Sequence, residues 1–120
     1  MAGSKIRVVE PNLTIVELSG HLHLGNELMV VEGSVRQLIT KGALKLVIDV
    51  SRLEYIDSAG IGMLVACNGQ IEKAGGQMRV AGAQGTVAKT FEVVHMGRIT
   101  SLDPDVDAAI EHLSAGGASA

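Results

Sequence analysis

Hydrophobic and polar positions change their period along the chain, and each change marks an element. Residues 6–9 and 13–20 are rich in aliphatic and β-branched side chains, and the turn signal Glu-Pro-Asn at 10–12 separates them. This pattern predicts two strands that pair as a hairpin. From Asn26 to a Lys-Gly stop at 41–42, apolar residues recur at helical spacing, which predicts the first helix. Its apolar stripe consists of Leu28, Val31, Val35, Leu38 and Ile39.

The rest of the chain alternates strand and helix patterns. Residues 43–50 form an almost continuous apolar run, which is typical of a strand buried on both faces of a largely parallel sheet. A second helix is predicted from the segment 56–64 to Ala74, where a Gly-Gly pair ends it. The elements that follow are a strand over 77–83, a helix over 86–97 that stops at Gly97, and a short strand over 98–102.

The last helix has the clearest predicted start in the chain. Asp103 is its expected N-cap, Pro104 takes the first helical position, and the stripe is Val106, Ala109, Ile110 and Leu113. The small residues 115–120 offer nothing to bury and predict a disordered tail. The resulting order ββαβαβαβα indicates an α/β fold. We expect one domain over 1–114, a mixed and mostly parallel sheet of about five strands, and four α-helices.

Composition and charge exclude several classes of function. Ten basic against thirteen acidic side chains give a formal charge of −3 without a Lys/Arg cluster, so no direct nucleic-acid binding is expected. The single Cys67 excludes an internal disulfide, and no Cys/His pairs have zinc spacing, so we expect no bound metal and a reducing compartment. No signal-peptide pattern and no bilayer-length apolar run is present. We therefore expect a cytoplasmic protein without membrane contact.

The segment Ile-Asp-Ser-Ala-Gly-Ile-Gly-Met-Leu at 56–64 is the main candidate for chemistry. A hydrolase nucleophile elbow needs glycine two residues before the serine, where this chain has Ile56, and no histidine spacing marks a base. A P-loop needs a lysine and a serine that the segment lacks, and a dinucleotide fingerprint needs glycine at Val65. The simplest interpretation is that Asp57 or Ser58 caps the following helix.

Two further features of the segment stay open on the residues alone. Gly60 and Gly62 each weaken a helix, so either tight packing or close approach of another backbone accounts for them. Ile61 can point inward with the helical stripe, whereas Met63 and Cys67 do not share it, so some apolar surface is expected outside. Contact with a neighbouring helix and a partner-docking patch explain that surface equally well.

The pattern Asp-Ser-x-Gly-[Ile/Leu/Val]-Gly-x-Leu, after a buried strand and a short turn, resembles the signature of the STAS domain of bacterial anti-sigma factor antagonists. In this chain the matching residues are Asp57, Ser58, Gly60, Ile61, Gly62 and Leu64. The likeness extends through Leu-Ser-Gly-His-Leu at 18–22, through 46–57 and through 75–82, and so covers nearly the whole chain. The resemblance implies a single STAS-type domain.

This resemblance implies a binding module in a partner-switching system rather than an enzyme. Its partner would be an anti-sigma factor that is also a serine/threonine kinase of the histidine-kinase-like ATPase type. Phosphorylation of Ser58 would end the binding, and a phosphatase would restore it. ATP and magnesium would belong to the kinase, so the chain would need no cofactor, and it would be a monomer or weak dimer. The residues expected to contact the partner are His21, His23, Asp57, Ser58, Ala59, Gly60, Ile61, Gly62 and Met63.

Two positions depart from the family pattern, and two other functions remain in view. His23 stands where family members commonly carry an acid, which bears on partner choice and on phosphorylation, and Ala59 replaces a frequent second serine. One alternative function is a STAS scaffold subunit of a larger stress-signalling assembly, which would form large particles. A remote alternative is a hydrolase that uses Ser58 with one of the four histidines.

Overall fold

The computed structural model describes residues 2–10 and 13–119, with side chains described for 3–9 and 13–114. The elements are β1 (Ala2–Glu10), β2 (Leu13–Leu22), α1 (Asn26–Thr40), β3 (Lys45–Ile56), α2 (Ser58–Lys73), β4 (Gln77–Ala81), α3 (Gly85–Val93), a 3-10 helix (Met96–Arg98), β5 (Ser101–Asp103) and α4 (Val106–Ser119). Over these described residues the strands and α-helices follow the order ββαβαβαβα, so the predicted α/β fold is confirmed. Pro11 and Asn12 of the predicted turn lie outside the described residues.

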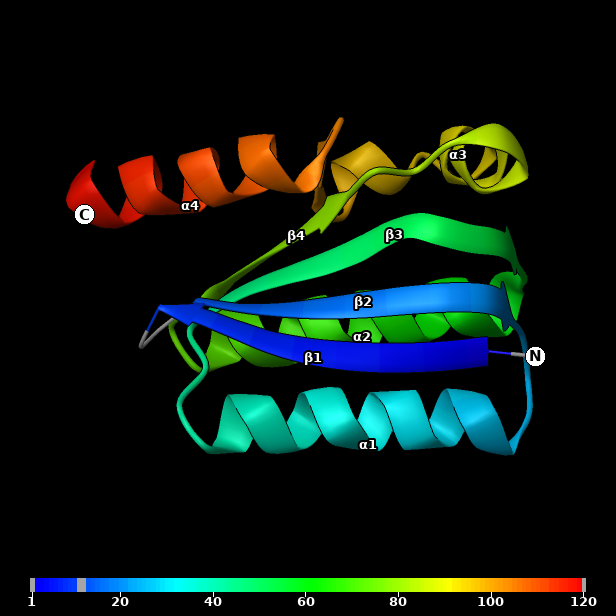
Figure 1. Cartoon of the computed structure of the whole chain (residues 1–120), viewed down its shortest axis with the longest axis horizontal. Helices are drawn as coiled ribbons and strands as arrows, with labels where there is room; N and C mark the ends of the chain where they lie inside the picture. The colour runs from blue at the N-terminus through cyan, green and yellow to red at the C-terminus, as the bar shows by residue number, and fades with distance from the viewer. Residues whose placement is uncertain (1, 11–12, 120) are drawn as a thin grey trace.

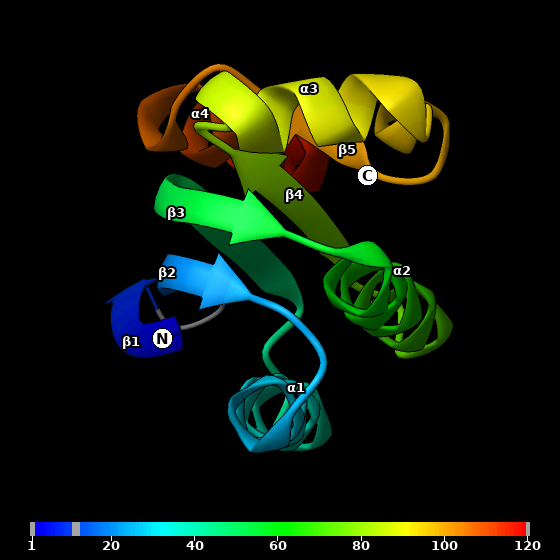
Figure 2. The same ribbon diagram turned by 90° about the vertical axis from the view of Figure 1, so that its right-hand side faces the viewer.

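The described strands form one five-stranded sheet in the order β1-β2-β3-β4-β5. β1 and β2 pair antiparallel, as the predicted hairpin requires, and the later neighbours all pair in parallel. In Figure 1, α1 and α2 lie on one side of the sheet and α4 lies on the other, and Figure 2 shows the same layers from the end. The sheet therefore separates two hydrophobic cores.

Alternating side chains of the central strands feed these two cores. Leu46 and Ile48 of β3 belong to the first core, which the sheet forms with α1, α2 and α3. Val47, between them, belongs to the second core, which the sheet forms with α4. Successive side chains of a strand point to opposite faces, so a strand covered on both faces reads as an unbroken apolar run. The run at 43–50 thus has the structural cause that its pattern predicted.

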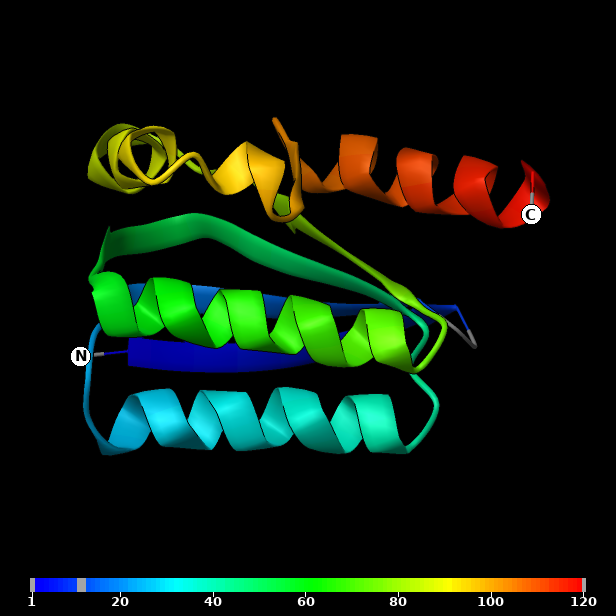
Figure 3. The same ribbon diagram turned by 180° about the vertical axis from the view of Figure 1, so that it is seen from behind.

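The apolar residues of α2 that lie off its predicted stripe are buried. Met63 and Cys67 are 4% and 1% exposed and belong to the first core. Burial raises the pKa of the Cys67 thiol to about 11, with smaller effects from Glu32 and Arg36 of α1. Figure 3 shows α1 and α2 side by side, so α2 is covered by the sheet and by α1. The expectation of apolar surface left outside is wrong for these two residues, and contact with a neighbouring helix explains them.

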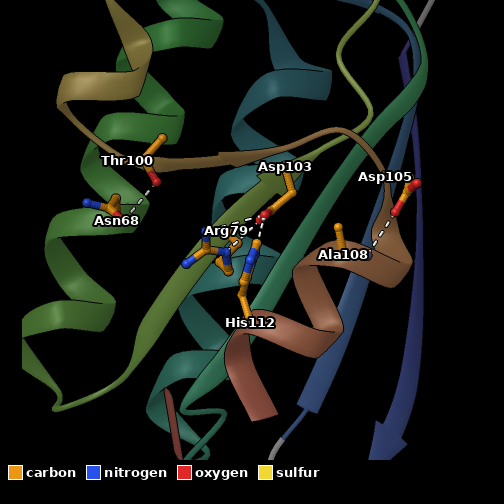
Figure 4. A network of polar contacts seen from close by, with 7 residues as sticks. All are labelled: Asn68, Arg79, Thr100, Asp103, Asp105, Ala108 and His112. Atoms are coloured by element: carbon orange, nitrogen blue, oxygen red, sulfur yellow. Dashed lines mark hydrogen bonds and ion pairs between the residues drawn. The ribbon is translucent and has the colours of Figure 1, made fainter. Parts of the chain in front are cut away.

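The start of the last helix is a correction to the sequence analysis. Asp103 lies in β5, and the N-cap of α4 is Asp105, whose Oδ1 accepts a hydrogen bond from the Ala108 N–H at 2.8 Å. The Asp103 side chain is instead 1% exposed and is bound by Arg79 and His112 (Figure 4). A carboxylate buried as deeply as that of Asp103 needs charged partners, and Arg79 and His112 supply them, so this pairing rather than a helix cap decides its place.

The segment between α3 and β5 also differs from its prediction. α3 ends at Val93 rather than at Gly97, because His95 takes a left-handed conformation with φ 55° that ends the helical path. A 3-10 helix follows, and β5 begins only at Ser101. At the other end of the chain, the backbone of α4 is helical to Ser119, which differs from the disordered tail predicted for 115–120, and Ala120 lies outside the described residues.

Candidate functional site

The segment 56–64 lies where β2 and β3 end and α2 begins. Leu22 at the end of β2 is the register partner of Ile56 at the end of β3. The next residue, Asp57, donates its backbone N–H to the Leu22 carbonyl at 3.1 Å. The pairing of the two strands therefore continues up to the first residue before the helix, and it fixes where the helix starts.

Asp57 is the N-cap of α2, which settles the choice between Asp57 and Ser58. Its backbone is extended, with φ −103° and ψ −176°, and its Oδ1 accepts the Gly60 N–H at 2.9 Å. Its Oδ2 accepts the backbone N–H of Leu24, in the loop between β2 and α1, at 3.1 Å. These donors, the Gly60 N–H foremost, hold the pKa of Asp57 below its usual range, so the carboxylate is ionised near neutral pH.

Ser58 is the first residue of α2, and its side chain is exposed. Because Asp57 makes the cap, the Ser58 hydroxyl is not needed for it, and within the described part of the chain it takes part in no hydrogen bond. An exposed hydroxyl at a helix N-terminus is accessible to an enzyme. It also lies at the positive end of the helix dipole, which accommodates a negative charge.

The two glycines of the segment have different roles. A Cβ atom on Gly60 would lie 2.6 Å from Cγ1 of Ile56 and 2.8 Å from the Leu22 carbonyl oxygen. Gly60 is therefore required by close packing of α2 against the two strand ends. Gly62 is exposed, and a Cβ atom there would have no neighbour within 4 Å among the described atoms. Packing does not explain Gly62, which leaves bare helix backbone next to Ser58.

Three of the predicted contact residues lie inside the protein. Gly60 is buried, Ile61 is 9% exposed and Met63 is 4% exposed, and both side chains belong to the first core. Ala59 is half-buried and packs against the same core. These residues shape the start of α2, whereas the surface of the segment belongs to Ser58 and Gly62, with a half-buried Asp57.

The two predicted histidines are exposed but point to different surroundings. His21 lies 3.5 Å from Glu54, Nε2 to Oε2, and its ring centroid lies 5.9 Å from that of Tyr55. His23 lies in the loop after β2, where its Nδ1 is 3.1 Å from the Leu24 carbonyl oxygen. The positive charge that His23 can carry is among the influences that lower the pKa of Asp57. His23 is thus part of the site around Asp57, whereas His21 contacts Glu54 and Tyr55 of the paired strand β3.

Sequence reasoning missed three exposed apolar residues near this site. Leu24 is 75% exposed in the loop that Asp57 binds, and Met29 and Val30 are 69% and 65% exposed in the first turns of α1. Both helices begin at the same end of the sheet (Figure 3). The sequence could have shown that Met29 and Val30 are exposed, because they lie outside the apolar stripe of α1 that includes Leu28 and Val31.

The described side chains do not assemble a hydrolytic or metal-binding centre at Ser58. His21 is engaged with Glu54, His23 with the Leu24 carbonyl and His112 with Asp103, so none of these three orients toward the serine as a general base would. Among the described residues, no group of three or more His, Cys, Asp or Glu side chains is arranged to hold a metal ion. None of the described helices is both long enough and apolar enough to cross a bilayer.

Comparison with known families places the fold. The family model described as STAS domain matches residues 5–109, so the chain belongs to the STAS domain family. A similar solved structure is that of TM1081 from Thermotoga maritima, assigned as an anti-sigma factor antagonist, with 20% identity, a TM-score of 0.83, and coverage of 92% of this chain and 94% of that one. An anti-sigma factor antagonist from Mycobacterium paratuberculosis has 20% identity, a TM-score of 0.81 and 95% coverage of both chains.

A third similar structure is of the Bacillus cell fate determinant SpoIIAA in its phosphorylated form. It has 20% identity, a TM-score of 0.72, and coverage of 92% of this chain and 98% of that one. At such identities the likeness concerns the fold.

Proposed function

We propose that this protein is an anti-sigma factor antagonist that binds an anti-sigma factor with serine kinase activity, and that phosphorylation of Ser58 ends the binding. The observation that carries the proposal is the exposed, unbonded hydroxyl of Ser58 at the start of α2, beside an aspartate that already caps the helix. Membership of the STAS family and similarity to two proteins named as anti-sigma factor antagonists support it, as does similarity to a protein whose structure is of a phosphorylated form. The kinase and its opposing phosphatase would act on the protein in the cytoplasm.

The effect of the phosphate follows from its position. A phosphoserine adds about −1.5 to −2 charges and three acceptor oxygens, which a helix N-terminus tolerates. The exposed side chain leaves room for the phosphate in the free protein, so the fold should survive. A partner packed over Ser58 would have to remove water from that dianion or meet it with a like charge, and either is costly. Phosphorylation should therefore act on binding and leave folding intact.

The surface for the partner consists of Ser58, Gly62 and the exposed apolar residues beside them. Gly62 offers bare backbone for close approach, and Leu24 and Met29 offer apolar side chains at the same end of the sheet. When a modifiable hydroxyl lies beside an apolar docking patch, adding a phosphate to it can switch off the binding of a partner there. His23, in place of the acid common in the family, would contribute to the choice of partner.

The test is phosphorylation and binding with the cognate kinase. Incubation with the kinase and ATP should modify Ser58, as peptide mass spectrometry shows, and Ser58→Ala should abolish the modification. Ser58→Asp should weaken binding to the anti-sigma factor by at least about 100-fold in isothermal titration calorimetry. Its melting temperature should stay within a few degrees of the unmodified protein.

A matched control is Ser114→Asp, which makes the same change of charge at an exposed serine of α4. It should bind like the parent protein, because α4 lies across the sheet from α2. Unaltered affinity of Ser58→Asp, or modification at another residue, would contradict the proposal.

A further inference from the structure

The carboxylate of Asp57 joins two parts of the molecule that are far apart in sequence. One oxygen holds the Gly60 N–H inside α2, and the other holds the Leu24 N–H in the loop between β2 and α1. The second bond spans 33 residues of sequence, whereas the first spans three. Asp57 therefore has a second role beyond capping, because it fixes the position of the loop relative to the start of α2.

The loop held in this way presents an apolar side chain. Leu24 is 75% exposed, although Leu22, two residues earlier at the end of β2, is 1% exposed. Gly25, the next residue, takes the N-cap position of α1 with a positive φ of 155°, and no side chain caps this helix with a hydrogen bond. The loop backbone makes three described contacts: the Leu24 N–H donates to Asp57, the Leu24 carbonyl contacts His23, and the Gly25 carbonyl accepts the Met29 N–H of α1 at 3.3 Å. Among these contacts, the bond to Asp57 is the one that ties Leu24 to the start of α2.

The N-terminus of α2 is already occupied by an anion. Asp57 takes the Gly60 N–H, and the Ala59 N–H also stabilises its charge. A phosphate on Ser58, the adjacent residue, would introduce a second and larger anion at the same few amide groups. Like charges at this separation repel each other, and both compete for the same donors. Of the two bonds that Asp57 makes, the bond to the loop is the one outside the helix, so its loss does not require the helix to open.

We propose that Asp57 is a positioning residue through which phosphorylation of Ser58 acts on the β2–α1 loop. In the unmodified protein its carboxylate holds the loop so that Leu24 contacts the partner, and the phosphate weakens this bond and releases Leu24. The inference rests on the proposed function for its biological meaning. The linkage from Ser58 to Leu24 belongs to the isolated protein and does not need the partner to be observed.

The first test separates the loop bond from the helix cap. In Asp57→Asn, the amide oxygen can still accept the Gly60 N–H, because asparagine is as good an N-cap as aspartate, but the amide nitrogen cannot accept the Leu24 N–H. The Leu24 amide should exchange with solvent about tenfold faster and shift upfield in NMR spectra. The matched control is Asp105→Asn, since Asp105 caps α4 in the same way and makes no second bond to a loop among the described residues.

A pH titration identifies the acceptor. In the unmodified protein the Leu24 amide resonance should move as Asp57 becomes protonated, at a pH below the ordinary aspartate range because the pKa of Asp57 is lowered. In Asp57→Asn the same resonance should not titrate there. A purely structural role of Asp57 would change stability in the variant without linking the Leu24 amide to this titration.

The second test introduces the phosphate. Protein with phosphoserine incorporated at position 58 should show the same change at the Leu24 amide as Asp57→Asn, while the Gly60 amide stays protected.

Partner binding should fall about tenfold in Leu24→Ala, whereas Val93→Ala, which truncates another exposed apolar residue (73% exposed) on α3, should bind normally.

The outcomes distinguish the two proposals. If the phosphate leaves the Leu24 amide unchanged but abolishes binding, the linkage through Asp57 is overturned and the proposed function stands. If the amide responds but neither phosphate nor Leu24→Ala affects binding, the linkage stands and the proposed function fails. Normal binding of Leu24→Ala together with strong binding by unmodified protein would remove Leu24 from the docking surface.

Discussion

At the scale of single residues, alanine substitutions at the two glycines of the Asp-Ser-Ala-Gly-Ile-Gly segment should have opposite effects on stability. Gly60→Ala should destabilise the protein by about 1–3 kcal/mol, because its Cβ would overlap Ile56 and the Leu22 carbonyl and force the strand ends apart. Gly62→Ala should stabilise it by up to about 1 kcal/mol, because alanine favours the helix and meets no neighbour among the described atoms. Urea denaturation followed by circular dichroism measures both.

The glycine pair also tests the functional role of bare backbone. If partner binding requires close approach at Gly62, Gly62→Ala should bind more weakly even though it folds more stably. If Gly60→Ala and Gly62→Ala change the stability equally and in the same direction, the strand ends accommodate a methyl group at position 60 without a loss of stability. That result would contradict the expectation for Gly60.

The sequence predicted that this segment opens a helix after a buried strand, but not which of its residues caps that helix. Asp57 and Ser58 are both good N-cap residues, and the sequence has no feature that chooses between them. The choice is made by the backbone, since the strand pairing of Leu22 with Ile56 places Asp57 in the extended conformation that a cap needs. The bond from Asp57 to Leu24 depends on the same tertiary placement, so no local pattern predicts it.

At the scale of elements, the buried carboxylate of Asp103 links α4 to the sheet through polar contacts with two partly exposed side chains. Asp103 of β5 meets Nε of Arg79 in β4 at 2.5 Å and Nδ1 of His112 in α4 at 2.6 Å (Figure 4). A hydrogen-bonded pair joins Asn68 of α2 to Thr100, just before β5 (Figure 4). Local sequence rules assigned Asp103 to a helix cap, because these rules cannot see an arginine 24 residues away.

Asp103 should make the stability of the protein depend on acid pH. Its burial opposes ionisation, but Arg79 and His112 outweigh that effect and lower its pKa. A carboxylate whose pKa is lower in the folded state stabilises the fold above its unfolded pKa of about 3.9, and that contribution is lost as pH falls through the lower folded value. The free energy of unfolding should therefore drop as the pH is lowered below about 4.

The variant that tests this is Asp103→Asn. At pH 7 it should lose on the order of 2 kcal/mol, because it removes the buried charge that pairs with the partly buried Arg79, and its stability should fall less steeply in acid. The exposed N-cap variant Asp105→Asn should keep both the stability and the steep acid limb of the parent. Urea midpoints between pH 7 and pH 2 measure the difference, and an unaltered acid limb in Asp103→Asn would assign the dependence to other carboxylates.

At the scale of the whole molecule, the hydrophobic pattern was sufficient for the order of the elements but not for the distribution of the core. Unbroken apolar runs and helical stripes determined which segments are strands and which are helices. The pattern did not show that α2 is covered by α1 as well as by the sheet, because that depends on how two helices pack side by side. The sequence therefore left open whether Met63 and Cys67 face a partner or a neighbouring helix, and the structure places both inside.

The unequal size of the two cores predicts unequal local stability. Of the described residues, 21 buried ones form the first core and six form the second, to which α4 contributes Ala109 and Leu113. A helix held by few buried apolar contacts opens at a lower free energy than the central strands. In native-state hydrogen exchange, amides of α4 before residue 115 should open at least about 1 kcal/mol more readily than those of β3 at 46–50.

Two core variants show whether α4 opens by itself. Leu113→Ala should increase exchange in α4 with a smaller effect in β3, because it weakens the second core alone. Leu64→Ala, in the first core, should increase exchange throughout by lowering global stability. Since Leu24 and Ser58 lie across the sheet from α4, opening of α4 should leave partner binding intact. Equal opening free energies in α4 and β3 would instead show that the two cores unfold as one unit.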